Sequence, residues 1–228
     1  FKDSIMLGLL VQGLEAIVKI AGPVVKSFAT QLVTKLPTII ETAVEVLRVV
    51  GPILKEVAKT LDVLKDGDDV EELGKKTMQE GTRPKMEEES MEDYFDYLRN
   101  EVKLDEERWK NMTAEDKLQA NVAGVSMVAT AISEKAKVDL SPDFILAMNK
   151  MEMSAKQISE YIKSFSEKNI DSMDSFTDYL RGELSGESKK EVFDAIEETE
   201  SRLHPDYSDG DILVEINSMK DKLSGEES

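Results

Sequence analysis

A tandem repeat in the first 66 residues constrains the fold of this chain more than any other feature. The segment IVKIAGPVVK (residues 17–26) recurs 29 residues later as VLRVVGPILK (residues 46–55). A period of 29 residues is close to eight turns of an α-helix, so both copies can present the same face. Because one copy of such a repeat cannot bury its apolar face alone, the repeat predicts an extended or stacked assembly element.

The repeat predicts apolar helices that are interrupted at prolines. Residues 4–64 are expected to be helical with breaks at Pro23, Pro37 and Pro52, because proline inside a helix removes a backbone hydrogen bond and clashes with the preceding turn. In the second copy, the charged residues follow one narrow stripe and leave an apolar face too wide for a single neighbour. We expect this face to be buried between several helices, in an oligomer or in lipid. The residues predicted to mediate self-association are Leu10, Leu14, Val25, Leu32, Ile39, Ile40, Leu47, Leu54 and Leu61.

The composition favours an all-α protein with an uneven charge. Helix-forming Glu, Lys, Leu, Ala and Met are common, whereas the 228 residues include only 12 Gly and 6 Pro. The net charge is −18: residues 1–66 carry eight basic and seven acidic residues, and residues 67–228 carry 21 and 40. Such an acidic chain is not expected to bind nucleic acid, which requires clustered cations. The lack of cysteine excludes thiolate chemistry and cysteine-ligated zinc.

The pattern predicts three regions along the chain. An extended apolar helical repeat, residues 1–66, is followed by a polar linker, residues 67–90, with a short helix at 69–79. Residues 91–228 are predicted to form an acidic helical-bundle domain. Its predicted helices cover residues 91–110, 114–136, 142–167, 172–184, 188–203 and 209–223, with a short strand at 212–216 as the alternative within the last.

A second repeat lies in the acidic region. SMEDYFDYLRNEV (residues 90–102) matches SMDSFTDYLRGEL (residues 172–184), and both segments read as helix starts. In one interpretation this is duplicated packing, with Tyr97 and Tyr179 in equivalent core positions. In the other, both copies are docking helices that contact a partner through Tyr97, Arg99, Tyr179 and Arg181, and the two linked copies gain avidity.

The sequence contains no pattern typical of an active site. His204 is the one histidine and lies at a predicted helix end, where an imidazolium suits the helix dipole. Asp206, Asp209 and Asp211 surround Gly210, but their spacing does not match a calcium-binding loop. We therefore predict no catalytic, cofactor-binding or metal-binding residue, and a protein that is not an enzyme.

One stretch of the first repeat has a family resemblance. LVTKLPTIIETAVEVL (residues 32–47) resembles the hydrophobic repeats of tape-measure proteins of long-tailed bacteriophages, in which an apolar helix, a Leu-Pro break and Ile-Ile-Glu precede another apolar helix. The resemblance covers residues 5–64. It implies a structural role, with helices packed about the axis of a tail or injection tube, and it carries over no catalytic residue.

Three hypotheses for function follow. The first is a non-enzymatic structural protein of a phage tail or related injection machine, which self-associates or packs on other tail proteins through its N-terminal helices. The second is a membrane-active secreted protein that inserts residues 4–64 into a bilayer. The third is an acidic adaptor or chaperone that binds a basic partner through the repeated Tyr-Leu-Arg helices. The expected location is a virion or tail particle after assembly in the host cytoplasm, or outside the cell.

Overall fold

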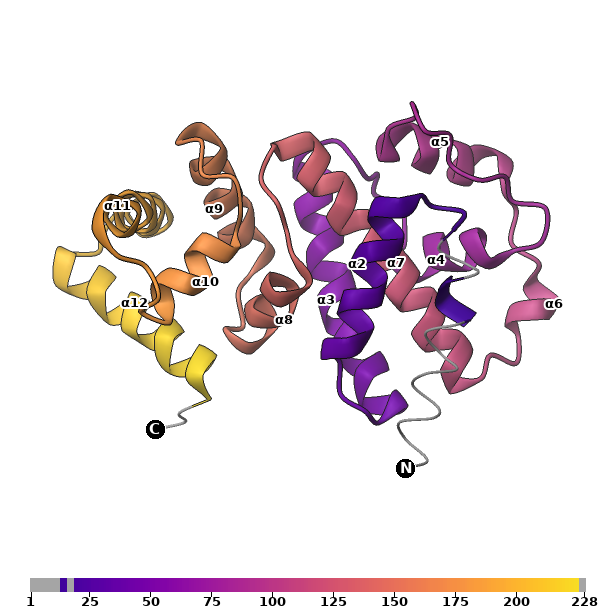
Figure 1. The fold of residues 1–228 in the computed structure, drawn as a ribbon, viewed down its shortest axis with the longest axis horizontal. Helices are drawn as coiled ribbons and strands as arrows, with labels where there is room; N and C mark the ends of the chain where they lie inside the picture. Colours follow the sequence, from indigo (N-terminus) through magenta and orange to yellow (C-terminus); the bar gives the residue numbers. More distant parts are fainter. Residues whose placement is uncertain (1–12, 16–18, 226–228) are drawn as a thin grey trace. The chain divides into compact units, whose positions relative to one another are not determined.

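The protein is all-α, as the composition predicts. The computed structural model describes residues 13–15 and 19–225 (Figure 1). In this part of the chain there are helices α2 to α12 and no strand, and the extended pairing consists of an isolated parallel bridge between Asp139 and Ser172. The chain separates into two compact units, unit 1 with residues 1–135 and unit 2 with residues 136–228. The division does not fall at the predicted linker, residues 67–90.

The described helices of unit 1 are α2 to α7. Their bounds are Pro23–Lys35 (α2), Ile40–Thr60 (α3), Val70–Met78 (α4), Met91–Glu101 (α5), Glu106–Trp109 (α6) and Ala114–Ala136 (α7). The short helix predicted at 69–79 is confirmed as α4, and the helix predicted at 114–136 is confirmed as α7. The single helix predicted at 91–110 is wrong. Asp105 begins a separate helix there, because its side chain accepts hydrogen bonds from the backbone N–H groups of Glu107 and Arg108.

The tandem repeat contributes to the core of unit 1. Helix α2 begins within the first copy and α3 contains the whole of the second, and equivalent positions of the two helices are buried: Val25 and Leu54, and Ala29 and Ala58. A Cβ at Gly51 of α3 would lie 3.6 Å from Val70 of α4, and the backbone N–H of Lys85 donates to the carbonyl of Ile20 at 2.7 Å. Within the described residues the repeat is therefore not a separate extended region. Its apolar face is covered by the rest of the same unit.

This packing decides which of the predicted self-association residues are accessible. Five of them, Leu14, Val25, Leu32, Leu47 and Leu54, are at most 3% exposed. Ile40 and Leu61 are half-buried, and Ile39 is 62% exposed. Leu10 lies outside the described residues. In this fold, the five buried side chains are not available to another molecule.

The prolines of the repeat act differently from one another. Gly22 and Pro23 begin α2, and α2 ends just before Leu36 and Pro37, so two of the predicted breaks are confirmed. The predicted break at Pro52 is wrong, because Pro52 lies inside the 21-residue helix α3. Pro52 is exposed, and the buried face of the helix continues past it through Leu54 and Val57. Burial of this face outweighs the one backbone hydrogen bond that proline removes.

Helices α4 and α7 cross with their backbones in contact, and glycine allows this approach. A Cβ at Gly74 of α4 would lie 1.8 Å from the carbonyl oxygen of Ala120, and one at Gly124 of α7 would lie 2.0 Å from that of Val70. Side chains from residue 120 to residue 132 of α7 are all buried. The close crossing fixes α4, which belongs to the predicted linker, firmly within unit 1.

Unit 2 contains five described helices. Their bounds are Pro142–Lys150 (α8), Ala155–Glu167 (α9), Asp174–Leu180 (α10), Gly186–Leu203 (α11) and Asp209–Ser224 (α12). The predicted single helix at 142–167 is wrong, because Glu152 adopts a positive φ of 54° and Ser154 caps a new helix by accepting from the N–H of Gln157. The strand alternative at 212–216 is also wrong, since these residues lie in α12.

Candidate functional site

The second repeat, residues 90–102 and 172–184, places one motif helix in each unit, α5 in unit 1 and α10 in unit 2. The two copies bury the same positions, which are Met91 and Met173, Tyr94 and Phe176, Phe95 and Thr177, and Leu98 and Leu180. Side chains at these positions pack into the core of their own unit. The two copies therefore share the same packing at four positions. The residues predicted to dock a partner are the tyrosines and arginines of the motif, which lie at other positions.

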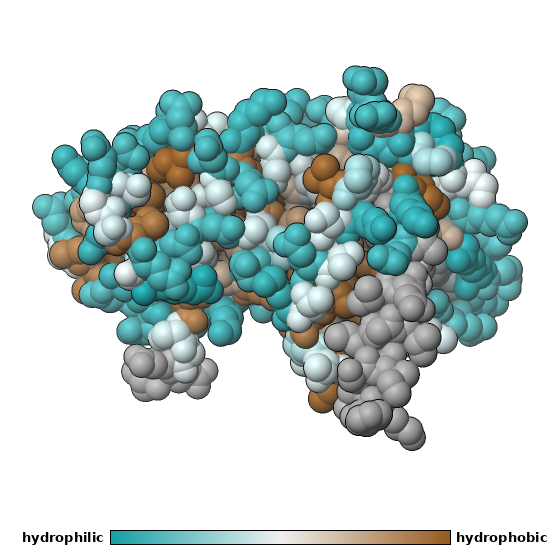
Figure 2. Space-filling model, viewed as in Figure 1, coloured by the Kyte–Doolittle hydropathy of each residue, from teal (hydrophilic) through white to brown (hydrophobic). Residues whose placement is uncertain are grey.

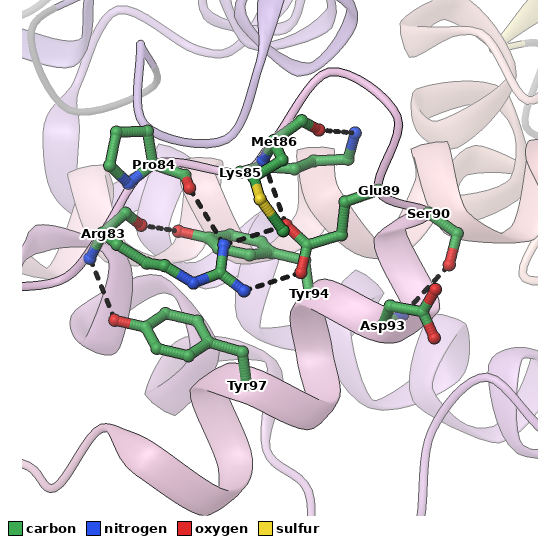
Figure 3. Close-up of polar contacts among 9 residues, drawn as sticks. All are labelled: Arg83, Pro84, Lys85, Met86, Glu89, Ser90, Asp93, Tyr94 and Tyr97. Atoms are coloured by element: carbon green, nitrogen blue, oxygen red, sulfur yellow. Dashed lines mark hydrogen bonds and ion pairs between the residues drawn. The ribbon is translucent and has the colours of Figure 1, made fainter.

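Tyr97 is covered by the loop of residues 83–89, which belongs to the same unit (Figure 3). The Arg83 guanidinium lies over the Tyr97 ring at 4.0 Å from the centroid, and the Arg83 backbone N–H donates to the Tyr97 hydroxyl at 2.9 Å. Glu89 accepts two hydrogen bonds from the same guanidinium, at 2.7 and 2.9 Å. Tyr94 completes the cluster by donating its hydroxyl to the Arg83 carbonyl at 2.9 Å. The four side chains fasten residues 83–89 to α5.

The charged groups of this cluster are Arg83 and Glu89, which form an ion pair. The hydrogen bonds from Arg83 hold the pKa of Glu89 below its usual value, against the smaller opposing effect of burial. Burial raises the pKa of Tyr94, with a further contribution from neighbouring Tyr97. A carboxylate kept ionised by a guanidinium and a phenol kept protonated do not make an acid–base pair near neutral pH. The hydrogen bonds of the cluster hold the loop on α5.

Tyr179 has a similar environment in unit 2. Its ring lies 6.0 Å from that of Phe193, and the Nζ of Lys220 lies 5.3 Å from its centroid. Burial raises the pKa of Tyr179. Both motif tyrosines thus hold a cation from another segment of the same unit. Both rings are half-buried and not in the core that the packing interpretation expected, and these contacts tie each ring to its own unit.

The two motif arginines have different environments. Arg99 donates to both carboxylate oxygens of Asp68, at 2.9 and 2.6 Å, and also pairs with Asp96. The side chain of Asp68 is 6% exposed, so this is a nearly buried bidentate pair. Arg181 is exposed. Of the four predicted contact residues, Arg181 alone presents its side chain fully to solvent.

A groove of about 760 Å³ lies beside the cluster in unit 1. It is lined by the start of α2, the segment 85–91, and Thr130 and Glu134 of α7. Two exposed apolar side chains, Val24 at 66% and Met86 at 60%, line it together with Lys19, Lys85 and several glutamates. Glu134 accepts from the first N–H of α5 at 3.1 Å. The lining mixes both signs of charge.

Unit 2 contains a buried polar cluster that the sequence analysis does not predict. Glu200 of α11 is fully buried, and its Oε1 accepts from the Tyr161 hydroxyl at 2.5 Å and from the Gln157 Nε2 at 3.1 Å. Its Oε2 makes no hydrogen bond and lies 3.7 Å from the Nε2 of His204. Burial raises the pKa of Tyr161 well above its usual value, and the charge of Glu200 adds to this. The missed signal was the spacing of Val192, Ile196 and Glu200, which places the glutamate on the apolar face of α11.

The Asp-rich turn before α12 serves as a helix cap. Asp211 accepts from the backbone N–H of Ser208 at 2.9 Å, and the Ser208 hydroxyl accepts from the N–H of Asp211 at 3.3 Å. Among residues 13–15 and 19–225, no group of three or more His, Asp or Glu side chains is arranged to hold a metal ion. None of the helices in the described part of the chain is long and apolar enough to cross a membrane.

Comparisons of the chain with protein-family models, with curated proteins and with solved structures found no match.

Proposed function

We propose that this chain is a non-enzymatic assembly protein that binds basic segments of partner proteins through the acidic surface of unit 2. The observation that carries the proposal is the charge of this unit. Residues 136–228 contain 11 Lys or Arg and 22 Asp or Glu, a net charge of −11. Exposed acidic residues lie along α11, at Glu187, Glu191, Asp194 and Glu198, and continue on α12.

The cations of unit 2 offset only part of this surface, because acidic residues outnumber them two to one and several cations already contact acidic or aromatic groups of the same unit. Lys168 pairs with Glu198 at 2.8 Å, and Lys222 pairs with Glu152 at 3.2 Å. A surface with surplus charge of one sign repels itself and attracts ligands of the other sign, which speeds their association. A basic partner relieves this repulsion, whereas nucleic acid and anionic lipid are repelled.

The resemblance of residues 5–64 to tape-measure repeats supports an assembly role in a phage tail or injection machine. In such a role, the repeat helices form the core of unit 1, and unit 2 meets other components. The membrane-active alternative receives less support. Its apolar residues, such as Leu32 and Leu47, are in the core, so insertion requires unit 1 to open.

Self-association through the outer side of the repeat helices is a second candidate function. Val24, Ile39 and Val49 are 66%, 62% and 53% exposed, although they come from the most apolar region of the chain. Exposed apolar side chains of this kind contribute to interfaces between copies when they form a contiguous patch. The absolute mass of the chain in solution distinguishes this candidate from the first.

Binding of a basic helical peptide tests the proposed function. The probe is a labelled amphipathic peptide of about 20 residues with leucine on one face and lysine elsewhere, and the matched control peptide has glutamate in place of lysine. We expect the full chain to bind the lysine peptide and not the glutamate peptide, as measured by fluorescence anisotropy. The affinity should fall between about 50 mM and about 300 mM salt, because exposed charges are screened over about 10 Å at 0.1 M. Equal binding of both peptides, or binding of neither, contradicts the proposal.

A further inference from the structure

The outward face of α12 is unusual for an exposed helix surface. Residues 212, 216, 219 and 223 of α12 are buried, and the opposite face carries Gly210, Leu213, Val214, Asn217 and Asp221. Leu213 is 50% exposed and Val214 is 69% exposed. Val214 lies one turn beyond Gly210 on the solvent face, and Leu213 lies on the flank between this face and the buried one. Figure 2 shows apolar atoms interrupting the hydrophilic surface of unit 2.

Another exposed apolar group precedes the helix. Tyr207, in the turn before α12, is 41% exposed, and one face of its ring stacks on His204 at 4.2 Å between centroids. Tyrosine is enriched in protein interfaces because its ring is rigid and apolar while its hydroxyl stays hydrated. The turn and the first half of α12 therefore supply three exposed apolar side chains within eight residues.

The charge around these side chains is acidic. Asp206, Asp209 and Asp221 are exposed, and Asp211 lies next to Ile212 at the helix start. Both lysines of α12 contact other parts of unit 2, since Lys220 lies over the Tyr179 ring and Lys222 pairs with Glu152. The surface next to Leu213 and Val214 thus presents carboxylates while its cations are engaged.

We propose that the face of α12 formed by Leu213 and Val214, with Tyr207 beside it, is the docking surface for a basic amphipathic helix of a partner protein. Apolar side chains of the partner pack on Leu213 and Val214, and its lysines or arginines reach the surrounding aspartates. Charge complementarity selects this occupant, because an acidic helix meets repulsion from Asp209 and Asp221. This inference rests on the proposed function and names the part of unit 2 that carries it.

Substitutions on the two exposed aliphatic residues test the inference in the full chain. The double variant Leu213→Ser, Val214→Ser is expected to weaken binding of the lysine peptide by about 10-fold or more, because buried contacts at the centre of an interface dominate affinity. The matched control is Val24→Ser, Ile39→Ser in unit 1, which removes equally exposed aliphatic side chains and should leave the affinity unchanged. Far-UV circular dichroism melts of both variants should match the parent, since all four side chains are exposed.

Charge variants provide the second arm of the experiment. Asp209→Asn, Asp221→Asn leaves the capping residue Asp211 intact and should reduce both the affinity and its dependence on salt. If the peptide binds the parent chain and the Leu213/Val214 variant equally well, this docking surface is wrong and the proposed function stands. If the peptide does not bind the parent chain, the proposed function fails first. If the Val24/Ile39 control weakens binding of the peptide and the Leu213/Val214 variant does not, the docking surface lies on unit 1 and the inference is wrong.

Discussion

Replacing Gly124 with alanine is expected to lower the free energy of unfolding of unit 1 by about 3–5 kcal/mol. The added Cβ meets the carbonyl oxygen of Val70 at 2.0 Å, a distance that no side-chain rotation can relieve because both atoms are fixed to backbone. Helices α4 and α7 have to separate by more than 1 Å, which opens gaps in the surrounding core. Overpacking costs of about 1–3 kcal/mol are ordinary, and a clash with backbone is at or above the upper end. Gly74→Ala, at 1.8 Å from the Ala120 carbonyl, should be equally severe.

Gly51→Ala is the matched control for this prediction. Gly51 is also buried, also helical and also faces Val70, but its added Cβ would lie 3.6 Å from the Val70 side chain, an ordinary contact. Alanine is favoured over glycine inside a helix by about 1 kcal/mol, whereas a Cβ directly before Pro52 is disfavoured in helical backbone. These two effects oppose each other, so the stability of this variant should stay within about 1 kcal/mol of the parent. Urea unfolding followed by circular dichroism compares the three proteins. Equal stability of Gly124→Ala and the parent shows that α4 does not cross α7 as described.

Replacing Arg99 with alanine is expected to cost about 3–4 kcal/mol. The substitution leaves Asp68 as a carboxylate that is 6% exposed and has lost its guanidinium, and breaking a buried ion pair on one side costs about 3–5 kcal/mol. Arg181→Ala, at the equivalent position of the second motif, removes an exposed side chain and should change stability by less than about 0.5 kcal/mol. Equal effects at the two positions contradict the different roles assigned to them.

The acid limb of the stability curve provides an independent test of the same pair. Burial acts to raise the pKa of Asp68, but hydrogen bonds from Arg99 and from the backbone N–H of Lys65 outweigh it and hold the pKa below its usual value. A carboxyl whose folded pKa is depressed adds stability above its unfolded pKa, and this stability is lost as the pH falls through the folded pKa. The difference in stability between the parent and Arg99→Ala should therefore be constant near neutral pH and shrink below about pH 4.

Local sequence signals predicted much of the fold. Ser90 and Ser141 cap α5 and α8, because their hydroxyls accept N–H groups at the helix starts, and the pattern of capping residue and apolar spacing finds such starts. Contacts between distant segments were the part that could not be predicted. Pro52 predicts a break in the helix. The structure shows why α3 continues, because Leu54 and Val57, which follow the proline, are buried on the face opposite to it.

The candidate site shows the same limit. The motif tyrosines were recognised as repeated residues, but Arg83, which covers Tyr97, lies in a polar segment without periodicity. The apolar repeat predicts a face that is buried between several helices, in an oligomer or in lipid, because periodicity reports that a face must be buried and not what covers it. Leu213 and Val214 belong to an apolar run in the sequence, which predicts burial. The packing of α12 on unit 2 through its other face shows that both side chains are exposed.

The absolute mass of the full chain, measured by light scattering on a sizing column without detergent, tests the central claim most directly. The claim is that the tandem repeat is the core of unit 1 and that the chain meets its partners through the exposed acidic surface of unit 2. It predicts a monomer of 25.5 kDa whose mass is the same at low and high salt. A discrete multimer that persists at high salt contradicts the claim and favours self-association through exposed apolar side chains such as Val24, Ile39 and Val49.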